Sequence, residues 1–195
     1  TECKLRGNQL RDDGRATSLD AVQVSGDGKT TTWELYREGL GPEIAKALAE
    51  YISVSASLTE CKLRGNQLRV EGWTIIFNAL RDSPSSKITT WDLTLEQLGP
   101  EIAKPLAEYI SVSASLTHCD VRENKIAGEG ASQLSAAVLA NTKIEVFNEI
   151  PIKEMRADSL TTLDLSKKGI GVEGGMVVAG LVPVTASLTT VWTPA

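Results

Sequence analysis

The three cysteines and the single histidine of this 195-residue chain are its best candidates for thiol or metal chemistry. Cys3, Cys61 and Cys119 recur at intervals of 58 residues, and His118 directly precedes the last of them. A cysteine and a histidine within hydrogen-bond reach can form a nucleophilic pair, and two cysteines with Cα atoms within about 7 Å can form a disulfide. Either chemistry requires that the surrounding elements bring these side chains together.

Two glycine-containing segments match parts of nucleotide-binding motifs. Gly169–Gly174 fits G-x-G-x-x-G, the pattern that places a helix start against a pyrophosphate. However, comparable turns hold glycines at Gly39–Gly41 and Gly128–Gly130, and no acidic residue follows Glu173 to hold a ribose. Gly28–Thr30 matches the end of a phosphate-binding loop, but a strand is expected after it where that motif needs a helix. We interpret both segments as turns.

The elements that hold these residues follow one repeated template. Apolar residues fall mostly at its first, fourth, sixth and eleventh places, with asparagine or a substitute at the ninth. Residues 59–69 repeat residues 1–11 without change, so two dissimilar repeats have been duplicated together. Such a pattern predicts a solenoid of stacked repeats with an inward column of side chains. The fourth-place residues that form this column are Cys3, Trp33, Cys61, Trp91, Cys119, Phe147, Leu163 and Val191.

A helical segment is expected after most strands. Pro42 suits the first helical position, and an apolar stripe runs from Ile44 to Ile52. The copy of this segment begins at Pro100 and contains Pro105, which would remove a hydrogen bond if it lay well inside the helix. Further helices are expected at Glu71–Arg81, Glu129–Leu139 and Glu173–Leu181, with a weaker one near Asp13–Val22 and none of full length between 144 and 160.

This arrangement separates the residues suited to thiol chemistry. Successive cysteines occupy alternate strands, so their Cα atoms should be about 9.5 to 10 Å apart at the roughly 4.8 Å spacing of neighbouring strands. His118 and Cys119 are adjacent in one strand and therefore point to opposite faces. We predict buried, reduced thiols, which favours a reducing compartment, and no catalytic, cofactor or metal site.

Residues beside the inward positions are predicted to form columns on an open face. We predict that this face binds a partner, with Arg64, Arg122 and Tyr36 as anchors, because arginine and tyrosine are enriched in binding hot spots. The alternative is a solvated face whose alternating charges pair across neighbouring strands. The candidate residues are Lys4, Glu34, Lys62, Asp92 and Asp120 in one column, Arg6, Tyr36, Arg64 and Arg122 in a second, and His118 in a third.

The template resembles the leucine-rich repeat, most closely in residues 58–68 and 160–170. With a helical stretch after each strand, the repeats are similar to the ribonuclease-inhibitor-like subtype. The resemblance implies an α/β solenoid, a curved horseshoe with parallel strands on the concave face and helices on the convex face, that binds proteins. The family's asparagine ladder is half present, because the ninth place holds Asn8, Asn66 and Asn124 but also Glu38, Glu96 and Lys168.

Composition agrees with one elongated domain. Hydrophobic residues make up 42% of the chain, charged residues 23%, and the net charge is −5. The acidic balance disfavours nucleic acid as a partner, and no apolar run approaches the roughly 18 residues that suggest a membrane span. Because the template is cut at Thr1 and just after Trp192, we expect residues 1–195 to be a single domain from a longer repeat array.

These observations predict a non-enzymatic protein-interaction module that binds another protein through its concave face. Two alternatives stay open. The module could regulate a partner enzyme, as an inhibitor or activator of a small GTPase or a nuclease. It could also be a purely structural subunit or a designed repeat scaffold, because the 58-residue units are nearly identical.

Overall fold

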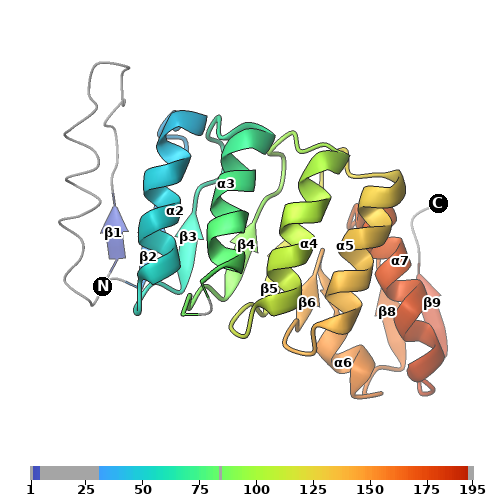
Figure 1. The fold of residues 1–195 in the computed structure, drawn as a ribbon. Coiled ribbons are helices and arrows are strands. Elements are labelled where there is room, and N and C mark those ends of the chain that lie inside the picture. The colour runs from blue at the N-terminus through green and yellow to red at the C-terminus, as the bar shows by residue number, and fades with distance from the viewer. Residues whose placement is uncertain (1, 5–30, 84, 193–195) are drawn as a thin grey trace.

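The computed structural model defines residues 2–4, 31–83 and 85–192, in which short strands alternate with helices (Figure 1). The strands are β1 (Glu2–Lys4), β2 (Thr32–Glu34), β3 (Glu60–Lys62), β4 (Thr90–Asp92), β5 (His118–Asp120), β6 (Val146–Phe147), β7 (Ile150–Pro151), β8 (Thr162–Asp164) and β9 (Thr190–Trp192). The helices are α2 (Ala45–Val54), α3 (Arg69–Arg81), α4 (Ala103–Val112), α5 (Gly128–Ala140), α6 (Ile152–Arg156) and α7 (Gly171–Leu181), with 3₁₀ turns η1 (Pro42–Ile44), η2 (Pro100–Ile102) and η3 (Val182–Val184).

The helices agree with the sequence pattern to within a few residues at their ends. The short α6 occupies the repeat that was predicted to lack a full helix. The weaker helix expected near Asp13–Val22 lies outside the described residues. In the described part of the chain, no helix has the length and apolarity needed to cross a membrane.

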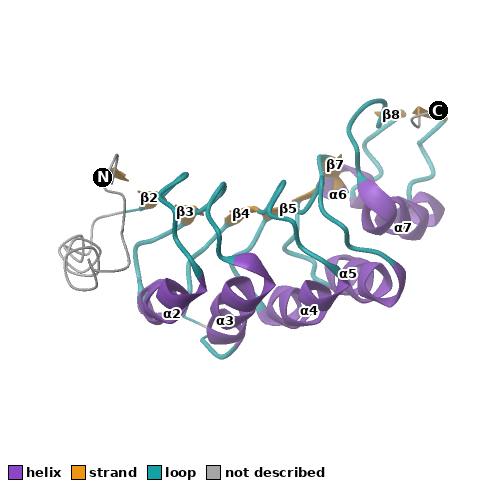
Figure 2. Ribbon diagram, turned by 90° about the horizontal axis from the view of Figure 1, so that it is seen from above, coloured by secondary structure: helices purple, strands orange, loops and turns teal. Residues whose placement is uncertain are grey.

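The strands stack in chain order. β1 to β7 form one sheet and β8 and β9 a second, and neighbours are parallel except for the antiparallel pair β6–β7. The register aligns Cys3 with Trp33 and Trp33 with Cys61. The same column continues through Trp91 and Cys119. Figure 2 shows the strands on the inner side of a curve and the helices on its outer side, so the predicted α/β solenoid is confirmed.

Side chains of the inward column form the core together with the helices. Trp91 meets the rings of Trp73 and Phe77 on α3 edge-on, with centroid distances of 5.7 and 5.8 Å. Trp33 stacks on Tyr51 of α2 at 4.5 Å. Such aromatic pairs contribute about 0.5–1.5 kcal/mol beyond their burial. The large and small inward residues alternate as predicted, and at most 4% of each is exposed: Trp33, Cys61, Trp91 and Cys119.

A ladder of threonines at the second place of the template ties successive repeats together, and it was not predicted. The carbonyl oxygen of Thr31 accepts the backbone N–H of Thr59 at 2.8 Å and its hydroxyl at 3.1 Å. The same pair of bonds joins Thr89 to Thr59, Thr117 to Thr89, and Thr189 to Thr161. These bonds connect the strand entrances, including repeats that lack the ninth-place asparagine.

Pro105 does not interrupt a helix. The segment from Pro100 to Ile102 forms the turn η2, and α4 begins at Ala103. Pro105 therefore lies in the first turn of α4, where backbone N–H groups have no intrahelical partner to lose. Its counterpart Ala47 occupies the same place in α2. The helix start explains why the chain accepts a proline that the sequence pattern placed in the interior.

We expect Pro105→Ala to leave stability unchanged or to lower it by up to about 1 kcal/mol, because proline restricts the unfolded chain. The matched substitution Ala47→Pro should be tolerated equally well. Urea denaturation of both variants measures this. A gain in the Pro105→Ala protein close to the roughly 3 kcal/mol cost of an interior proline would contradict the observed helix start.

The short repeat between residues 144 and 160 closes the first sheet and fastens the end of α5. Arg156 of α6 donates hydrogen bonds of 2.9 to 3.1 Å to four backbone carbonyls. Burial lowers the pKa of Arg156. Because the last carbonyls of a helix lack intrahelical partners, this one side chain supplies donors at the end of α5 and in the turn that follows it. The four carbonyls belong to Val138, Leu139, Asn141 and Ile144.

Candidate functional site

The first predicted column is present on the strand face. The register pairs Lys4 with Glu34 and Glu34 with Lys62. The side chain of Lys4 and all of Arg6 lie outside the described residues. Glu34 and Lys62 form an ion pair across β2 and β3. The cross-strand pairing considered as the alternative for this face therefore occurs at its β2–β3 end.

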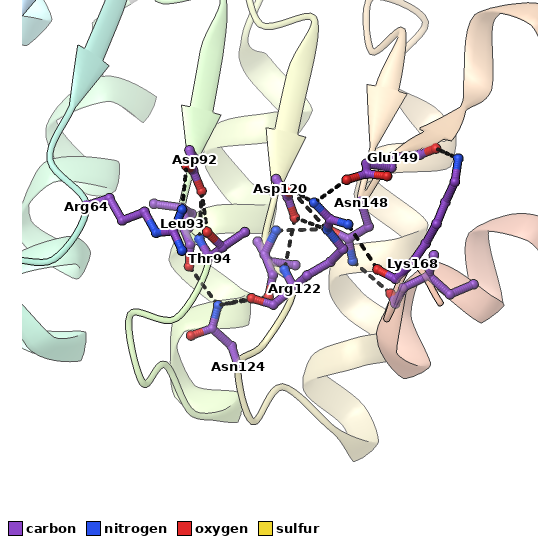
Figure 3. Close-up of polar contacts among 12 residues, drawn as sticks. Arg64, Asp92, Leu93, Thr94, Asp120, Arg122, Asn124, Asn148, Glu149 and Lys168 are labelled. Carbon is purple, nitrogen blue, oxygen red and sulfur yellow. Dashed lines mark hydrogen bonds and ion pairs between the residues drawn. The ribbon is translucent and has the colours of Figure 1, made fainter. Parts of the chain in front are cut away.

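Two aspartates lie side by side in the centre of the face. Asp92 and Asp120 are directly aligned on β4 and β5, which is unfavourable for like charges. Each carboxylate accepts a hydrogen bond from the backbone N–H two residues further on, at 3.0 Å from Thr94 and 3.1 Å from Arg122 (Figure 3). These turns fix the direction of both carboxylates and offset part of their repulsion.

Arg122 bridges three segments of the molecule (Figure 3). Its guanidinium Nη2 lies 2.8 Å from Asp120 and 2.6 Å from Glu149, and Nη1 donates to the carbonyl of Lys168 at 3.0 Å. The hydrogen bond to Asp120 is the main cause of its raised pKa. Because Lys168 follows β8, Arg122 connects the two sheets. Only 19% of its side chain is exposed, so it has less surface to offer a partner than was expected.

Tyr36 and Arg64 are more accessible than Arg122. Tyr36 is 47% exposed, and the guanidinium of Arg37 lies 5.0 Å from the centroid of its ring. The Arg64 side chain is 38% exposed, and its Nη1 lies 3.7 Å from the carboxylate of Asp92. Charge-assisted hydrogen bonds are typically about 2.7–2.9 Å long. Arg64 is therefore held loosely and keeps donors available.

His118 is exposed on β5, where its Nδ1 lies 2.8 Å from the hydroxyl oxygen of Thr117. The neighbouring Cys119 is buried on the opposite face, as predicted. Beside His118, a hydrogen bond from Lys153 lowers the pKa of the Glu145 carboxyl. His118 is thus placed to contact a partner but not to activate a thiol.

The described cysteines are buried and free. Burial raises the pKa of both Cys61 and Cys119 above the usual range of a thiol. Strand β4 lies between the strands that carry them. The side chain of Cys3 on β1 lies outside the described part of the chain. Across residues 31–83 and 85–192, no group of three or more histidine, cysteine or acidic side chains is arranged to hold a metal ion.

Two buried carboxyl groups stabilise turns and were not predicted as such. Glu96, at the ninth place, accepts the backbone N–H of Gly65 at 2.8 Å and the indole N–H of Trp73 at 3.2 Å. Glu173, at the start of α7, accepts an amide N–H of Asn148 at 3.1 Å. Burial raises the pKa of both carboxyls. The ninth-place position was the one signal in the sequence that pointed to Glu96.

Glu173→Gln is expected to flatten the dependence of stability on pH. The folded pKa of Glu173 is raised above its ordinary value. The folded state therefore binds more protons, and this contribution is greatest below the unfolded pKa of about 4.3 and is lost as pH rises through the folded pKa. Glutamine keeps an acceptor for Asn148 without the titration. In urea denaturation between about pH 4 and 8, the free energy of unfolding of the variant should rise relative to that of the wild type as pH increases. A difference independent of pH would contradict the raised pKa.

A shallow groove of about 600 Å³ opens on the helix side, between α4 and α5. Alanines form much of its floor, and Lys104, Glu108 and Gln133 contribute polar side chains. Glu108 is held by an ion pair of 2.6 Å with Arg81. This groove is the main rival of the strand face as a binding surface, and substitutions at Lys104 can report on it.

Comparisons with known proteins support the repeat architecture. A family model described as "Leucine Rich repeat" matches residues 112–135, which include β5. The Ran GTPase-activating protein 2 of Caenorhabditis elegans is 24% identical over 140 residues, covering 71% of this chain and 14% of that protein. The solved structure of "Leiomodin-1 Actin-Binding Site 2 (ABS2)" has a TM-score of 0.62 at 13% identity and covers 86% of each chain. At that identity the structural likeness concerns the fold alone.

Proposed function

We propose that this leucine-rich-repeat protein is a non-enzymatic module that binds another protein through its strand face. The main support is the rigid presentation of mixed side chains on β2 to β5. Their backbone is tied into a parallel ladder, while Tyr36 is 47% exposed and the side chain of Asp92 is also 47% exposed. Tyrosine and arginine are enriched in protein interfaces and in their binding hot spots.

The similarity to a Ran GTPase-activating protein supports a protein as the partner. That relative is by name an activator of the GTPase Ran. This chain spans 14% of the length of that relative, so the identity of its own partner is a separate question. The buried, unpaired thiols of Cys61 and Cys119 argue against thiol chemistry at these positions and favour a reducing compartment.

Within the predicted face, we assign partner contacts to the accessible residues. Arg122 is engaged with Asp120 of its own repeat and with Glu149 and the carbonyl of Lys168 in later ones. The face proposed to bind the partner therefore consists of Tyr36, Lys62, Arg64, Asp92 and His118, with Glu34 beside them and with Lys4 and Arg6 as proposed contacts outside the described part.

Capture from an extract of the source cells tests this assignment. Immobilised wild-type protein should retain a partner that Arg64→Glu loses by about tenfold or more, since hot-spot arginines have effects of that size. The matched control is Lys104→Glu, which makes the same charge change in the helix-side groove. Retention by Arg64→Glu together with loss by Lys104→Glu would place the binding site on the helix side instead.

Regulation of a small GTPase is a second candidate, favoured by the similarity to a Ran GTPase-activating protein. It predicts that GTP hydrolysis by a Ran-type GTPase accelerates or slows when this protein is added. Arg64→Glu should abolish the effect if the strand face mediates it. Hydrolysis at the same rate with and without the protein would remove this candidate.

A further inference from the structure

Two cationic and two largely apolar side chains lie in consecutive repeats at the β2–β4 end of the strand face, and we call this group the Tyr36 patch. It consists of Tyr36, Arg37, Arg64 and Leu95. They occupy the seventh and eighth places of three consecutive repeats, just after β2, β3 and β4. The residue at the eighth place has a left-handed backbone conformation in each described repeat that follows the template. The residues at this place therefore lie along one ridge: Arg37, Gly65, Leu95, Glu123 and Lys167.

Arg37 is preorganised but lacks an acidic partner among the described residues. Its guanidinium lies over the ring of Tyr36 at 5.0 Å, and no ion pair to a described carboxylate accompanies that contact. Its aliphatic stem crosses Gly65, where an added Cβ would lie 2.7 Å from the Arg37 Cγ and 3.5 Å from the Tyr36 ring. Gly65 thus makes room for Arg37 to extend toward the repeat that carries Arg64.

Arg64 keeps most of its hydrogen-bonding capacity. Its nearest described carboxylate oxygen, on Asp92, is 3.7 Å away. The other oxygen of Asp92 is occupied by the backbone N–H of Thr94 at 3.0 Å and by its hydroxyl at 2.7 Å. Two neighbouring arginines with open donors suit a carboxylate, because a guanidinium binds one in a bidentate manner.

Leu95 adds an apolar contact next to these charges. It is 57% exposed and has a φ of 62°, a conformation that is unfavourable for residues other than glycine. The preceding repeat has Gly65 at the same place. An exposed leucine in this conformation contributes little to the folded chain alone, but it would be buried by a ligand lying across the ridge.

We propose that the Tyr36 patch recognises a partner segment in which a carboxylate binds Arg37 and Arg64 and an apolar side chain packs on Leu95. This inference rests on the proposed function of the strand face. Two strand spacings of roughly 4.8 Å separate the repeats of Arg37 and Leu95, and an extended chain advances about 3.3 Å per residue. The acidic and apolar residues of the segment are therefore about three positions apart. Asp120, in the repeat after the one that carries Leu95, repels further acids and sets the direction of the segment.

A phage-displayed library of random dodecapeptides provides the probe. Selection on the wild-type protein should enrich peptides with an aspartate or glutamate about three positions from a large apolar residue. Binding of those peptides should fall by about tenfold or more in Arg37→Glu/Arg64→Glu and in Leu95→Gly. Leu95→Gly should melt at the same or a higher temperature, because glycine adopts a positive φ readily. The control Lys46→Glu/Lys104→Glu makes the same charge change on the helix side and should bind normally.

The possible outcomes separate this inference from the proposed function. Enrichment of basic peptides whose binding is lost in Asp92→Asn would overturn the Tyr36 patch and leave the strand face as the binding surface. If the selected peptides fail to bind only the Lys46→Glu/Lys104→Glu variant, both the Tyr36 patch and the strand face would be ruled out as the binding surface. Selection without enrichment, or acidic peptides that bind Arg37→Glu/Arg64→Glu as well as the wild type, would also overturn recognition by the patch.

Discussion

Leu63→Asp is expected to destabilise the protein by about 4 kcal/mol or more, because an uncompensated charge in a core is among the most costly single substitutions. Leu63 is at the sixth place of its repeat, follows β3 and is 0% exposed. Leu63 belongs to the buried apolar cluster that the strands form with the helices. Because each repeat packs mainly on its two neighbours, opening this one should weaken both sides of the array.

Lys62→Ala is the matched control, one residue away on the strand face. The Lys62 side chain is 45% exposed and pairs with Glu34, and surface ion pairs contribute about 0–1 kcal/mol. Guanidinium denaturation followed by circular dichroism should therefore separate the two variants clearly. Equal stabilities would mean that the inward and outward positions of the strands have been exchanged.

Arg156→Met is expected to lower the free energy of unfolding by about 3 kcal/mol or more, since buried carbonyls left without partners cost about 1–3 kcal/mol each. Arg156 donates to four partly buried carbonyls at the end of α5 and in the turn that follows it. Methionine retains the apolar bulk of the side chain but has no donor. Hydrogen exchange should show the loss of protection beginning in α5 and α6.

Arg81→Met serves as the comparison for Arg156→Met. Arg81 ends α3 and pairs with Asp82 and Glu108, but its side chain is 33% exposed. Its removal should cost less than about 1 kcal/mol, as for other surface ion pairs. If both methionine variants lose the same stability, the hydrogen bonds of Arg156 do not have the role assigned to them.

The inward column was predictable from sequence because the side-chain direction in a strand depends only on the register. Trp33, Cys61 and Trp91 recur at one place of the template and are buried together. The helix ends were less predictable. Whether Pro105 lies in the first turn depends on the turn η2, which shifts the start of α4 to Ala103.

The role of Arg122 was not predictable from its template place. Arg64 and Arg122 occupy the same place two repeats apart, but their neighbours differ. Arg122 meets Glu149 and the carbonyl of Lys168, which the hairpin β6–β7 and the second sheet bring to it. That hairpin belongs to the short repeat and has no counterpart in the template. The threonine ladder was missed for a related reason, since the bond from Thr59 to Thr31 exists only once the repeats are stacked.

Site-specific photocrosslinking tests most directly whether the strand face binds the partner. p-Benzoylphenylalanine would replace Glu60 or Thr90 on the strand face, and Lys46 or Gln133 on the helix side. After irradiation in an extract of the source cells, we predict covalent adducts of one partner from the two strand-face positions and none from the helix-side positions. Adducts formed only from Lys46 or Gln133 positions would contradict the account.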